Sequence, residues 1–262
     1  MIKLFNLEKK YFDVIDNNGN CFIAYWAELY ILIIKINFSS IIINNSENIT
    51  TEKVSLTKTD KPNQDNDFTF KNKKLGITFV FNGKKTGVKE ELYQNIQEEK
   101  LVWDCHHPLA SVSLYYDGIN YRGLGYSETI HMSLAPWELP IDELRWGRYL
   151  SQDTSIVWIE WKGSNPLRKI YYNSSYYEDG SIDNEKLVFG SGKYQVYFLS
   201  PSVIYEGKIS NHLKNLNWLK WIINKRILET IEVKFKSKAI FKVNDSMMNT
   251  GWSLYEIVKW KK

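Results

Sequence analysis

The residues best suited to proton-transfer chemistry lie in the segment GLGYSE, residues 123–128. Tyr126 and Glu128 are two positions apart, so on a β-strand their side chains point to the same face. Burial penalises the charged form of a carboxyl group, and an apolar wall around Glu128 would therefore raise its pKa. A glutamate of that kind is suited to act as a general acid near neutral pH. The alternative is an ordinary ion pair between Glu128 and one of three arginines (Arg122, Arg145 or Arg148).

This pair lies within an aromatic-rich stretch, residues 103–163, which holds five of the ten tryptophans and three of the four histidines. Large aromatic side chains beside a few polar groups are typical of a pocket for an apolar molecule. Tryptophan packing in the core of a sheet would account for the aromatic residues alone. If a pocket exists, its predicted ligand-binding residues are Trp103, His106, His107, His131, Trp137, Arg145, Trp146, Arg148 and Trp158.

Other kinds of catalytic site have little support. Adjacent histidines on a strand face opposite ways, so His106 and His107 are not expected to bind one metal ion, and no HExxH spacing occurs. The chain has no G-x-S-x-G nucleophile elbow and no phosphate-binding Walker loop. GLGYSE lacks the third glycine and the following helix of a dinucleotide site. We therefore predict no metal and no cofactor. Glu128 and Glu160 could instead form a carboxylate pair for glycoside hydrolysis.

Composition narrows the class of protein. The net charge of +4 is small and the lysines are scattered, so no nucleic-acid partner is predicted. Cys21 and Cys105 do not indicate a disulfide framework. The first residues lack the apolar core of a signal peptide. Polar residues interrupt the apolar segment 21–43, so it is predicted as two strands and not as a membrane span. These features predict a cytoplasmic protein without stable membrane insertion, and they leave its oligomeric state open.

Most of the chain before the aromatic stretch has the pattern of β-strands. The turn at residues 17–20 (NNGN) separates two strand-like runs and predicts a hairpin. Residues 68–70 and 77–81 are predicted to pair, and the polar segment 58–67 to form a turn. Residues 89–100 are interpreted either as one or two helical turns or as a solvated connection.

The last third of the chain contains both kinds of pattern. Leucine and isoleucine recur every three or four residues in segment 211–227, which predicts an amphipathic helix with Asn211 as its N-cap. Residues 231–243 alternate between apolar and charged, which predicts a strand with one face in water. Residues 251–260 are predicted as a final strand. The expected fold class is therefore all-β, an antiparallel barrel or pair of barrels with one late α-helix.

Two motifs in the aromatic stretch carry a resemblance to a known family. With VWDCHHPLA before them and GWSLYEIVKW near the end, Gly125-Tyr126-x-Glu128 and Trp146-Gly147-Arg148 resemble the carotenoid 1,2-hydratase (hydroxyneurosporene synthase) superfamily. The resemblance covers roughly residues 100–165 and 250–260. The family commonly has aspartate at the position of Glu128.

The resemblance implies two lipocalin-like, calycin-type β-barrel or half-barrel domains with a ligand cavity. We place the domains at residues 1–163 and 164–262, because Ser164-Asn165-Pro166 is the strongest turn after the central strands. Relatives of known chemistry act on large apolar substrates without a metal or organic cofactor. The hydratases protonate a terminal double bond and add water, and fungal relatives cyclise polyenes.

Three functions are compatible with these residues. The first is a cofactor-free lyase or isomerase acting on a hydrophobic natural product, with Glu128 as proton donor and Tyr126 positioning it. The second is a non-catalytic lipocalin-like protein that binds a small apolar molecule. The third is a carbohydrate-active protein with a tryptophan-floored groove. The first two share one expected partner, a hydrophobic small molecule.

Overall fold

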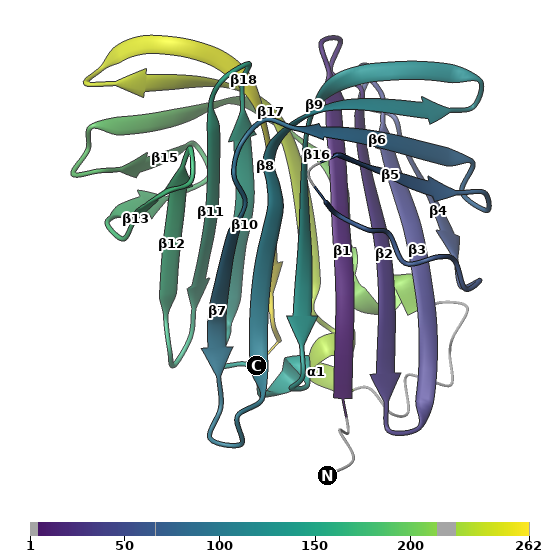
Figure 1. Ribbon diagram of the computed structural model, residues 1–262. Helices are drawn as coiled ribbons and strands as arrows, with labels where there is room; N and C mark the ends of the chain where they lie inside the picture. The colour runs from purple at the N-terminus through teal and green to yellow at the C-terminus, as the bar shows by residue number, and fades with distance from the viewer. Residues whose placement is uncertain (1–4, 66, 214–223, 262) are drawn as a thin grey trace. The chain divides into compact units, whose positions relative to one another are not determined.

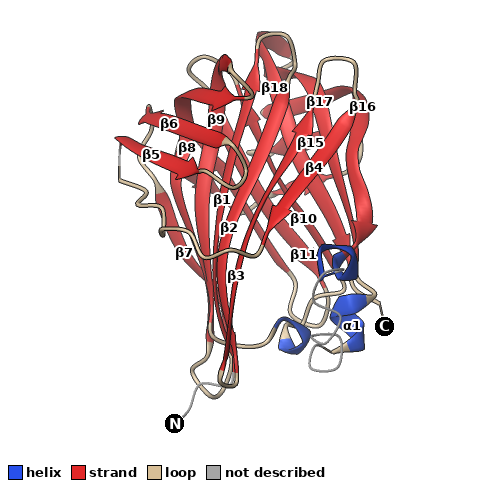
Figure 2. Cartoon of the chain, turned by 90° about the vertical axis from the view of Figure 1, so that its right-hand side faces the viewer, coloured by secondary structure: helices blue, strands red, loops and turns tan. Residues whose placement is uncertain are grey.

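The computed structural model describes residues 5–65, 67–213 and 224–261. The chain forms two compact units, Met1–Ala135 and Pro136–Lys262, and each contains one antiparallel nine-stranded sheet. One sheet is a half-barrel and the other is a nearly closed barrel. The helical segments of the described residues are short (Figure 2). The predicted all-β class with two barrel-type halves and a late helix is confirmed.

The sheet of the first unit has the strand order β4-β3-β2-β1-β9-β8-β6-β5, with β7 also paired to β8 (Figure 1). The long strand β8 pairs with β7 along its first part and with β6 along its last part. The strands are β1 (Phe5–Asp16), β2 (Cys21–Ile31), β3 (Ile34–Asn44), β4 (Thr50–Ser55), β5 (Asp67–Asn72), β6 (Ile77–Gly83), β7 (Val88–Gln94), β8 (Lys100–Tyr116) and β9 (Ile119–Met132).

The sheet of the second unit has the order β13-β12-β11-β10-β18-β17-β16-β15-β14. Its strands are β10 (Glu143–Leu150), β11 (Ser155–Lys162), β12 (Leu167–Tyr172), β13 (Ser175–Tyr177), β14 (Gly180–Ile182), β15 (Lys186–Phe189), β16 (Tyr194–Lys208), β17 (Ile231–Val243) and β18 (Ser246–Lys259). Within residues 5–65, 67–213 and 224–261, the helical segments are the 3-10 turns η1 (Pro136–Glu138) and η2 (Ile209–Leu213) and the α-helix α1 (Lys225–Leu228).

Each sheet curls around its own apolar core. In the first unit, Phe12 on β1 stacks on Phe70 of β5 at 4.8 Å, although these strands are far apart in the sheet order. The side chains of Asn72 and Ser39 join β5 to β3 through a 2.9 Å hydrogen bond. In the second unit, Tyr177 of β13 meets Phe189 of β15 at 5.2 Å. These aromatic and polar contacts join strands that are far apart in the order of each sheet.

Several predicted elements are confirmed. The NNGN turn joins β1 to β2, and the carboxylate of Asp16 accepts hydrogen bonds from the backbone N–H groups of Asn18 and Asn20. Segment 21–43 forms the paired strands β2 and β3. Residues 68–70 and 77–81 pair as β5 and β6. Among the described residues, no helix is long and apolar enough to span a membrane.

The interpretation of residues 89–100 was wrong. They form most of β7, a turn and the start of β8. Leu92 is buried and Ile96 is 94% exposed, so these two residues do not share an apolar helix face. The Asn95 side chain accepts hydrogen bonds from the N–H groups of Gln97 and Glu99, and this asparagine turn competes with a helix.

The charged side chains of strand 231–243 were predicted to face water, and this prediction was wrong for two lysines. Lys234 and Lys236 are 3% and 4% exposed. Lys234 is neutralised by Glu232 at 2.5 Å and by Glu256, which supplies the charge partner that a buried lysine requires. Alternation in sequence identified the strand, but it did not reveal that part of its charged side is covered.

Two further expectations concern boundaries. Residues 214–223 of the predicted helix 211–227 lie outside the described residues; the described α1 begins after Asn224, whose side chain accepts from Arg226 N–H at 2.8 Å. The compact units divide after Ala135, whereas the proposed boundary was at Gly163. The turn at residues 164–166 connects the paired strands β11 and β12 of the second unit.

The core of the first unit provides a matched test of strand alternation. Phe79 is fully buried, and its neighbour Val80 is 38% exposed. We expect Phe79→Ala to lower the free energy of unfolding by about 3–5 kcal/mol, because it leaves a cavity in the aromatic core. We expect Val80→Ala to change it by no more than about 1 kcal/mol. Urea denaturation of both variants measures the difference, and equal losses would contradict the described burial.

Candidate functional site

The candidate site is organised by the middle of strand β9, residues 125–129, which is buried on both faces. Tyr126, Ser127, Glu128 and Thr129 are all at most 7% exposed. Their side chains alternate between the two faces of the first sheet. Ser127 lies opposite Phe12 in the register, so we call its side the Phe12 face. The opposite side, with Tyr126 and Glu128, is the Glu128 face.

On the Glu128 face, a carboxylate collects two hydrogen-bond donors. The Tyr126 hydroxyl donates to Glu128 Oε2 at 2.6 Å, and Trp103 Nε1 donates to the same oxygen. Trp103 is 1% exposed and Tyr126 is fully buried, whereas Glu128 keeps 7% exposure. Glu128 is therefore the most accessible member of this Tyr126–Glu128–Trp103 cluster. Oε2 can accept both hydrogen bonds whether the carboxyl group is ionised or carries a proton on its other oxygen.

The pairing register of β8 with β9 and the small size of Gly125 explain why Trp103, Tyr126 and Glu128 lie together. Trp103 lies two residues before Cys105, and Cys105 is opposite Glu128, which places the indole on the same face as the carboxylate. A Cβ at Gly125 would clash with the backbone oxygen of Asp13 and with the Val112 side chain. Glycine at this position therefore lets β1 approach β9 closely beside Tyr126.

The Glu128 face carries a second carboxylate–phenol pair that sequence reasoning missed. The Tyr11 hydroxyl donates to Asp13 Oδ2 at 3.0 Å on β1. In the register Tyr11 is opposite Glu128 and Asp13 is opposite Tyr126. The Tyr11 and Tyr126 rings also meet edge to face at 5.9 Å. The spacing Tyr11-x-Asp13 is the signal that could have revealed the pair, because it repeats that of Tyr126-x-Glu128.

Burial sets the protonation of the phenol and of the neighbouring thiol. The pKa of Tyr126 is raised well above its usual value, chiefly by burial and also by the nearby Cys105 and Glu128. Burial likewise raises the pKa of the Cys105 thiol. Both groups are therefore neutral around pH 7, and Tyr126 is a hydrogen-bond donor to Glu128. Cys21 and Cys105 are both free and buried.

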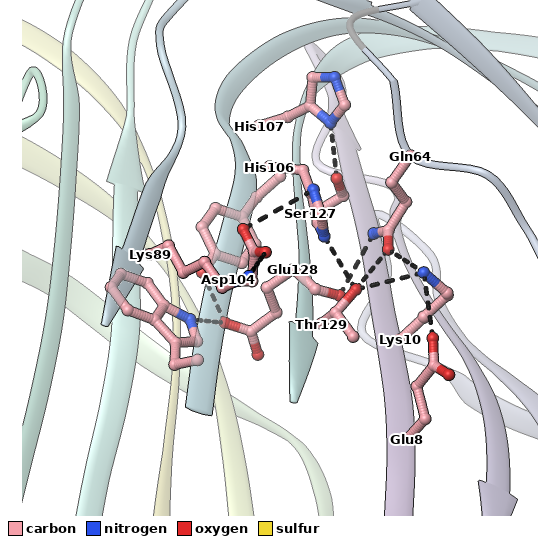
Figure 3. A network of polar contacts seen from close by, with 12 residues as sticks. Glu8, Lys10, Gln64, Lys89, Asp104, His106, His107, Ser127, Glu128 and Thr129 are labelled. Carbon is pink, nitrogen blue, oxygen red and sulfur yellow. Dashed lines mark hydrogen bonds and ion pairs between the residues drawn. The ribbon is translucent and has the colours of Figure 1, made fainter. Parts of the chain in front are cut away.

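The Phe12 face carries a separate polar network (Figure 3). Lys10 Nζ donates to Gln64 Oε1 at 2.7 Å and to Thr129 Oγ1 at 3.3 Å. The Thr129 hydroxyl donates to Gln64 Oε1 at 2.5 Å, and Gln64 Nε2 donates to the backbone oxygen of Glu128 at 3.3 Å. Gln64 comes from the polar segment 58–67, which was predicted only as a turn. Burial lowers the pKa of Lys10, and the nearby Glu8 opposes this.

The prediction that His106 and His107 face opposite ways was wrong. His106 Nε2 lies 2.9 Å from Thr129 Oγ1, and His107 Nδ1 lies 2.7 Å from Ser127 Oγ. Since Ser127 and Thr129 share the Phe12 face, both histidines lie there. The register of β8 shifts between Cys105 and His107, and this bulge inserts one residue and resets the alternation. Neither histidine is therefore on the Glu128 face.

The remaining histidine of the predicted site lies at the end of the same network. His131 is opposite Glu8 in the register and is exposed. Burial lowers the pKa of His106 to about 4, with Asp104 opposing the shift, and burial also lowers the pKa of His131. Among the described residues no cluster of three or more histidine, cysteine, aspartate or glutamate side chains has a geometry that could hold a metal ion.

The other predicted site residues belong to the second unit. Trp146 and Arg148 are buried on one face of β10, and Arg148 Nη1 donates to the backbone oxygen of Trp252 at 3.1 Å. Trp158 is in the core of this unit, 5.8 Å from the ring of Phe198. A Cβ at Gly147 would clash with Trp158, so the glycine of the Trp-Gly-Arg motif makes room for that indole.

Three further residues of the second unit have other partners. Arg145 Nε pairs with Glu143 Oε1 at 2.9 Å and so takes part in a local ion pair. The backbone oxygen of Trp137, in η1, accepts from Arg226 at 3.4 Å. Glu160, considered above as a glycosidase carboxylate, is buried and pairs with Arg168 at 2.6 Å. Arg145 and Glu160 are thus explained by local charge pairing.

Comparisons with known proteins support the fold. No protein-family model matches the sequence, and no curated protein matches it. Solved structures do match. Kievitone hydratase from Nectria haematococca superposes with a TM-score of 0.58 at 10% identity, covering 97% of this chain and 88% of that chain. CghA with Sch210972 gives 0.56 at 10% identity, with the same two coverages. A candidate AttH of Nitrosomonas europaea gives 0.56 at 7% identity, covering 97% and 91%.

These matches extend over nearly the whole of each chain, so the two-barrel architecture is common to all of them. At identities of 7–10% the likeness concerns the fold alone. The structural neighbours agree with the all-β fold of two barrel-type halves that the sequence predicted. Membership of the superfamily has no support from sequence comparison. Fold similarity by itself does not assign function, which depends on the site.

The low pKa of His106 predicts a pH-dependent stability. Between about pH 6.5 and 4 the unfolded chain binds a proton at this position that the folded chain does not. The free energy of unfolding therefore falls as the pH is lowered through this window. We expect His106→Gln to flatten that part of the curve in urea titrations, while His131→Gln, at the exposed position, has a smaller effect. An unchanged slope in His106→Gln would contradict the buried, neutral imidazole.

Proposed function

We propose that the chain binds a hydrophobic small molecule containing a carbon–carbon double bond and catalyses its acid-assisted hydration, isomerisation or cyclisation. The observation that carries this proposal is the Tyr126–Glu128–Trp103 cluster, in which a nearly buried carboxyl group is held by a phenol and an indole. The resemblance to the carotenoid 1,2-hydratase superfamily agrees with it. The fold shared with kievitone hydratase and CghA adds support.

The proposed reaction begins with proton transfer from Glu128. The carboxyl proton forms a C–H bond at one alkene carbon, and the other carbon becomes cationic. The faces of aromatic side chains stabilise positive charge, so the Trp103 and Tyr126 rings beside the carboxyl group suit this step. Because Tyr126 stays protonated, it serves as a fixed hydrogen-bond donor that orients Oε2.

The cation then has three fates, and each one returns a proton. Water can add to the cation and lose a proton, which gives net hydration. Loss of a proton from a neighbouring carbon gives net isomerisation. Attack by a second double bond, followed by proton loss, gives a ring. In each case the Glu128 carboxylate can take up the released proton, so the enzyme regenerates without another reactant.

Tyr11 and Asp13 have a supporting part in this proposal. The Asp13 carboxylate holds the Tyr11 hydroxyl, and the Tyr11 ring packs against the edge of Tyr126. Their role is to fix the position of Tyr126, and through it the position of Glu128. Asp13 is fully buried, so it acts as a positioning residue and does not touch substrate.

A second candidate function is non-catalytic binding of an apolar ligand. One observation favours it: both donors to Glu128 Oε2 form a closed, buried cluster, and such clusters also serve to satisfy polar groups inside a protein. In that case Glu128 would contribute to stability and would transfer no proton. The two functions differ in their response to a change that keeps the shape of Glu128 and removes its acid proton.

The test uses deuterium incorporation, which requires no knowledge of the product. The chain is incubated in D2O with a panel of polyenes and isoprenoid alkenes, and recovered compounds are examined by mass spectrometry. We expect wild type to place deuterium on carbon in at least one compound. Glu128→Gln should lower the rate by roughly 100-fold or more, the usual contribution of a general acid. Tyr126→Phe should lower it less.

Glu98→Gln is the matched control, because Glu98 is exposed in the turn after β7. It should leave deuterium incorporation unchanged. Full activity in Glu128→Gln would overturn the acid role. Retention of an alkene by wild type in native mass spectrometry, with no deuterium uptake in any compound, would favour the binding protein instead.

A further inference from the structure

Two hairpin turns of the first unit expose large apolar side chains. Leu32 and Ile33, between β2 and β3, are 51% and 94% exposed, and Ile96, between β7 and β8, is 94% exposed. Isoleucine is ordinarily among the most buried residue types, so nearly complete exposure at two separate turns is unusual. We call these three side chains the apolar tips.

The register places both turns at the same end of the first sheet. Ile31 is opposite Phe5 at the start of β1, and Met132 at the end of β9 is opposite Leu7 and Leu101. Lys100 at the start of β8 is opposite Gln94 at the end of β7. Figure 1 shows both turns at the lower end of this sheet. Four strand spacings separate the turns, roughly 20 Å.

The backbone conformation of Leu32 is unfavourable for leucine. Its φ is +54°, a left-handed conformation that asparagine, aspartate and glycine adopt readily and leucine does not. Two other hairpins of this chain use favourable residues at such positions, Asp117-Gly118 and Asn244-Asp245. Leucine at this position therefore lowers the stability of the β2–β3 turn. Residues that oppose the local conformational preference are expected at functional sites, so we take Leu32 as a sign of function.

Two ion pairs lie beside the apolar tips, and the exposed Glu98 is in the same turn as Ile96. Lys35 forms an ion pair with Glu28 at 2.7 Å beside the first turn, and Lys100 pairs with Glu91 at 2.6 Å beside the second. Lys35 also lies over the Tyr30 ring at 5.1 Å. Paired charges lower the electrostatic cost of bringing the turns to an uncharged surface. They also leave little excess positive charge to attract a strongly anionic surface.

We propose that the apolar tips dock the first unit on the surface of a neutral phospholipid bilayer. Side chains of this kind can enter the boundary between headgroups and acyl chains while the sheet stays in water. A stable protein partner would bury about 800 Å² of each surface, which three side chains on two separate turns do not provide. A fluid bilayer accommodates separate projections. Docking there would also give access to ligands dissolved in the membrane.

Vesicle flotation without any substrate tests the proposal, so its result is independent of the proposed function. The full chain should float with neutral phosphatidylcholine vesicles, equally at low and high salt. Ile33→Ser combined with Ile96→Ser should weaken binding at least about tenfold, because two apolar side chains no longer leave water. Ile49→Ser is the matched control: Ile49 is 59% exposed at the opposite end of β3 and should bind as wild type does.

Leu32→Asn adds a readout that distinguishes docking from folding. Asparagine suits φ +54°, so this variant should raise Tm while it weakens vesicle binding. Failure of wild type to float, equal binding by the double variant, or equal loss in Ile49→Ser would overturn the proposal. So would a wild-type dimer in size-exclusion chromatography that the double variant loses, because the tips would then contact a second copy of the chain.

Discussion

The first unit depends on a strand, β9, whose middle residues 125–129 are buried on both faces. Polar groups removed from water must find partners inside the protein, and β9 places four consecutive side chains under that constraint. On one face Glu128 is satisfied by Tyr126 and Trp103. On the other, Thr129 is satisfied by Gln64, Lys10 and His106. Neighbouring strands and one loop are positioned by these partners.

The two faces are suited to different tasks. The Glu128 face combines a carboxyl group with aromatic rings and with Tyr126, whose pKa burial raises so that the phenol stays protonated and donates to the carboxyl group. The Phe12 face joins the loop carrying Gln64 to β1 and β9 through buried hydrogen bonds, and one of these reaches the backbone of Glu128. The network behind the sheet therefore helps to hold the strand that carries the candidate acid.

Comparison with solved structures separates what is shared from what is particular to this chain. A common two-barrel architecture at 10% identity or below shows that very different sequences satisfy the same sheet geometry. In this chain, Gly125 and Gly147 stand where a Cβ would clash with neighbouring atoms. The side chains on β9, and the exposed turns of the first unit, are where this chain can differ in ligand or location.

The sequence by itself determined the all-β class, the strand pairs β1–β2, β2–β3 and β5–β6, and the placing of Tyr126 and Glu128 on one face, because these follow from local alternation and turn residues. It did not predict β7, since a charged strand and a solvated helix have similar composition. Only the tertiary structure revealed the bulge that turns His106 and His107 to one face, because one inserted residue leaves no mark in the alternation. Only it identified Asp13, Lys10 and Gln64 as neighbours of β9, and Lys234 as buried, because burial depends on what covers a strand and not on the strand's own pattern.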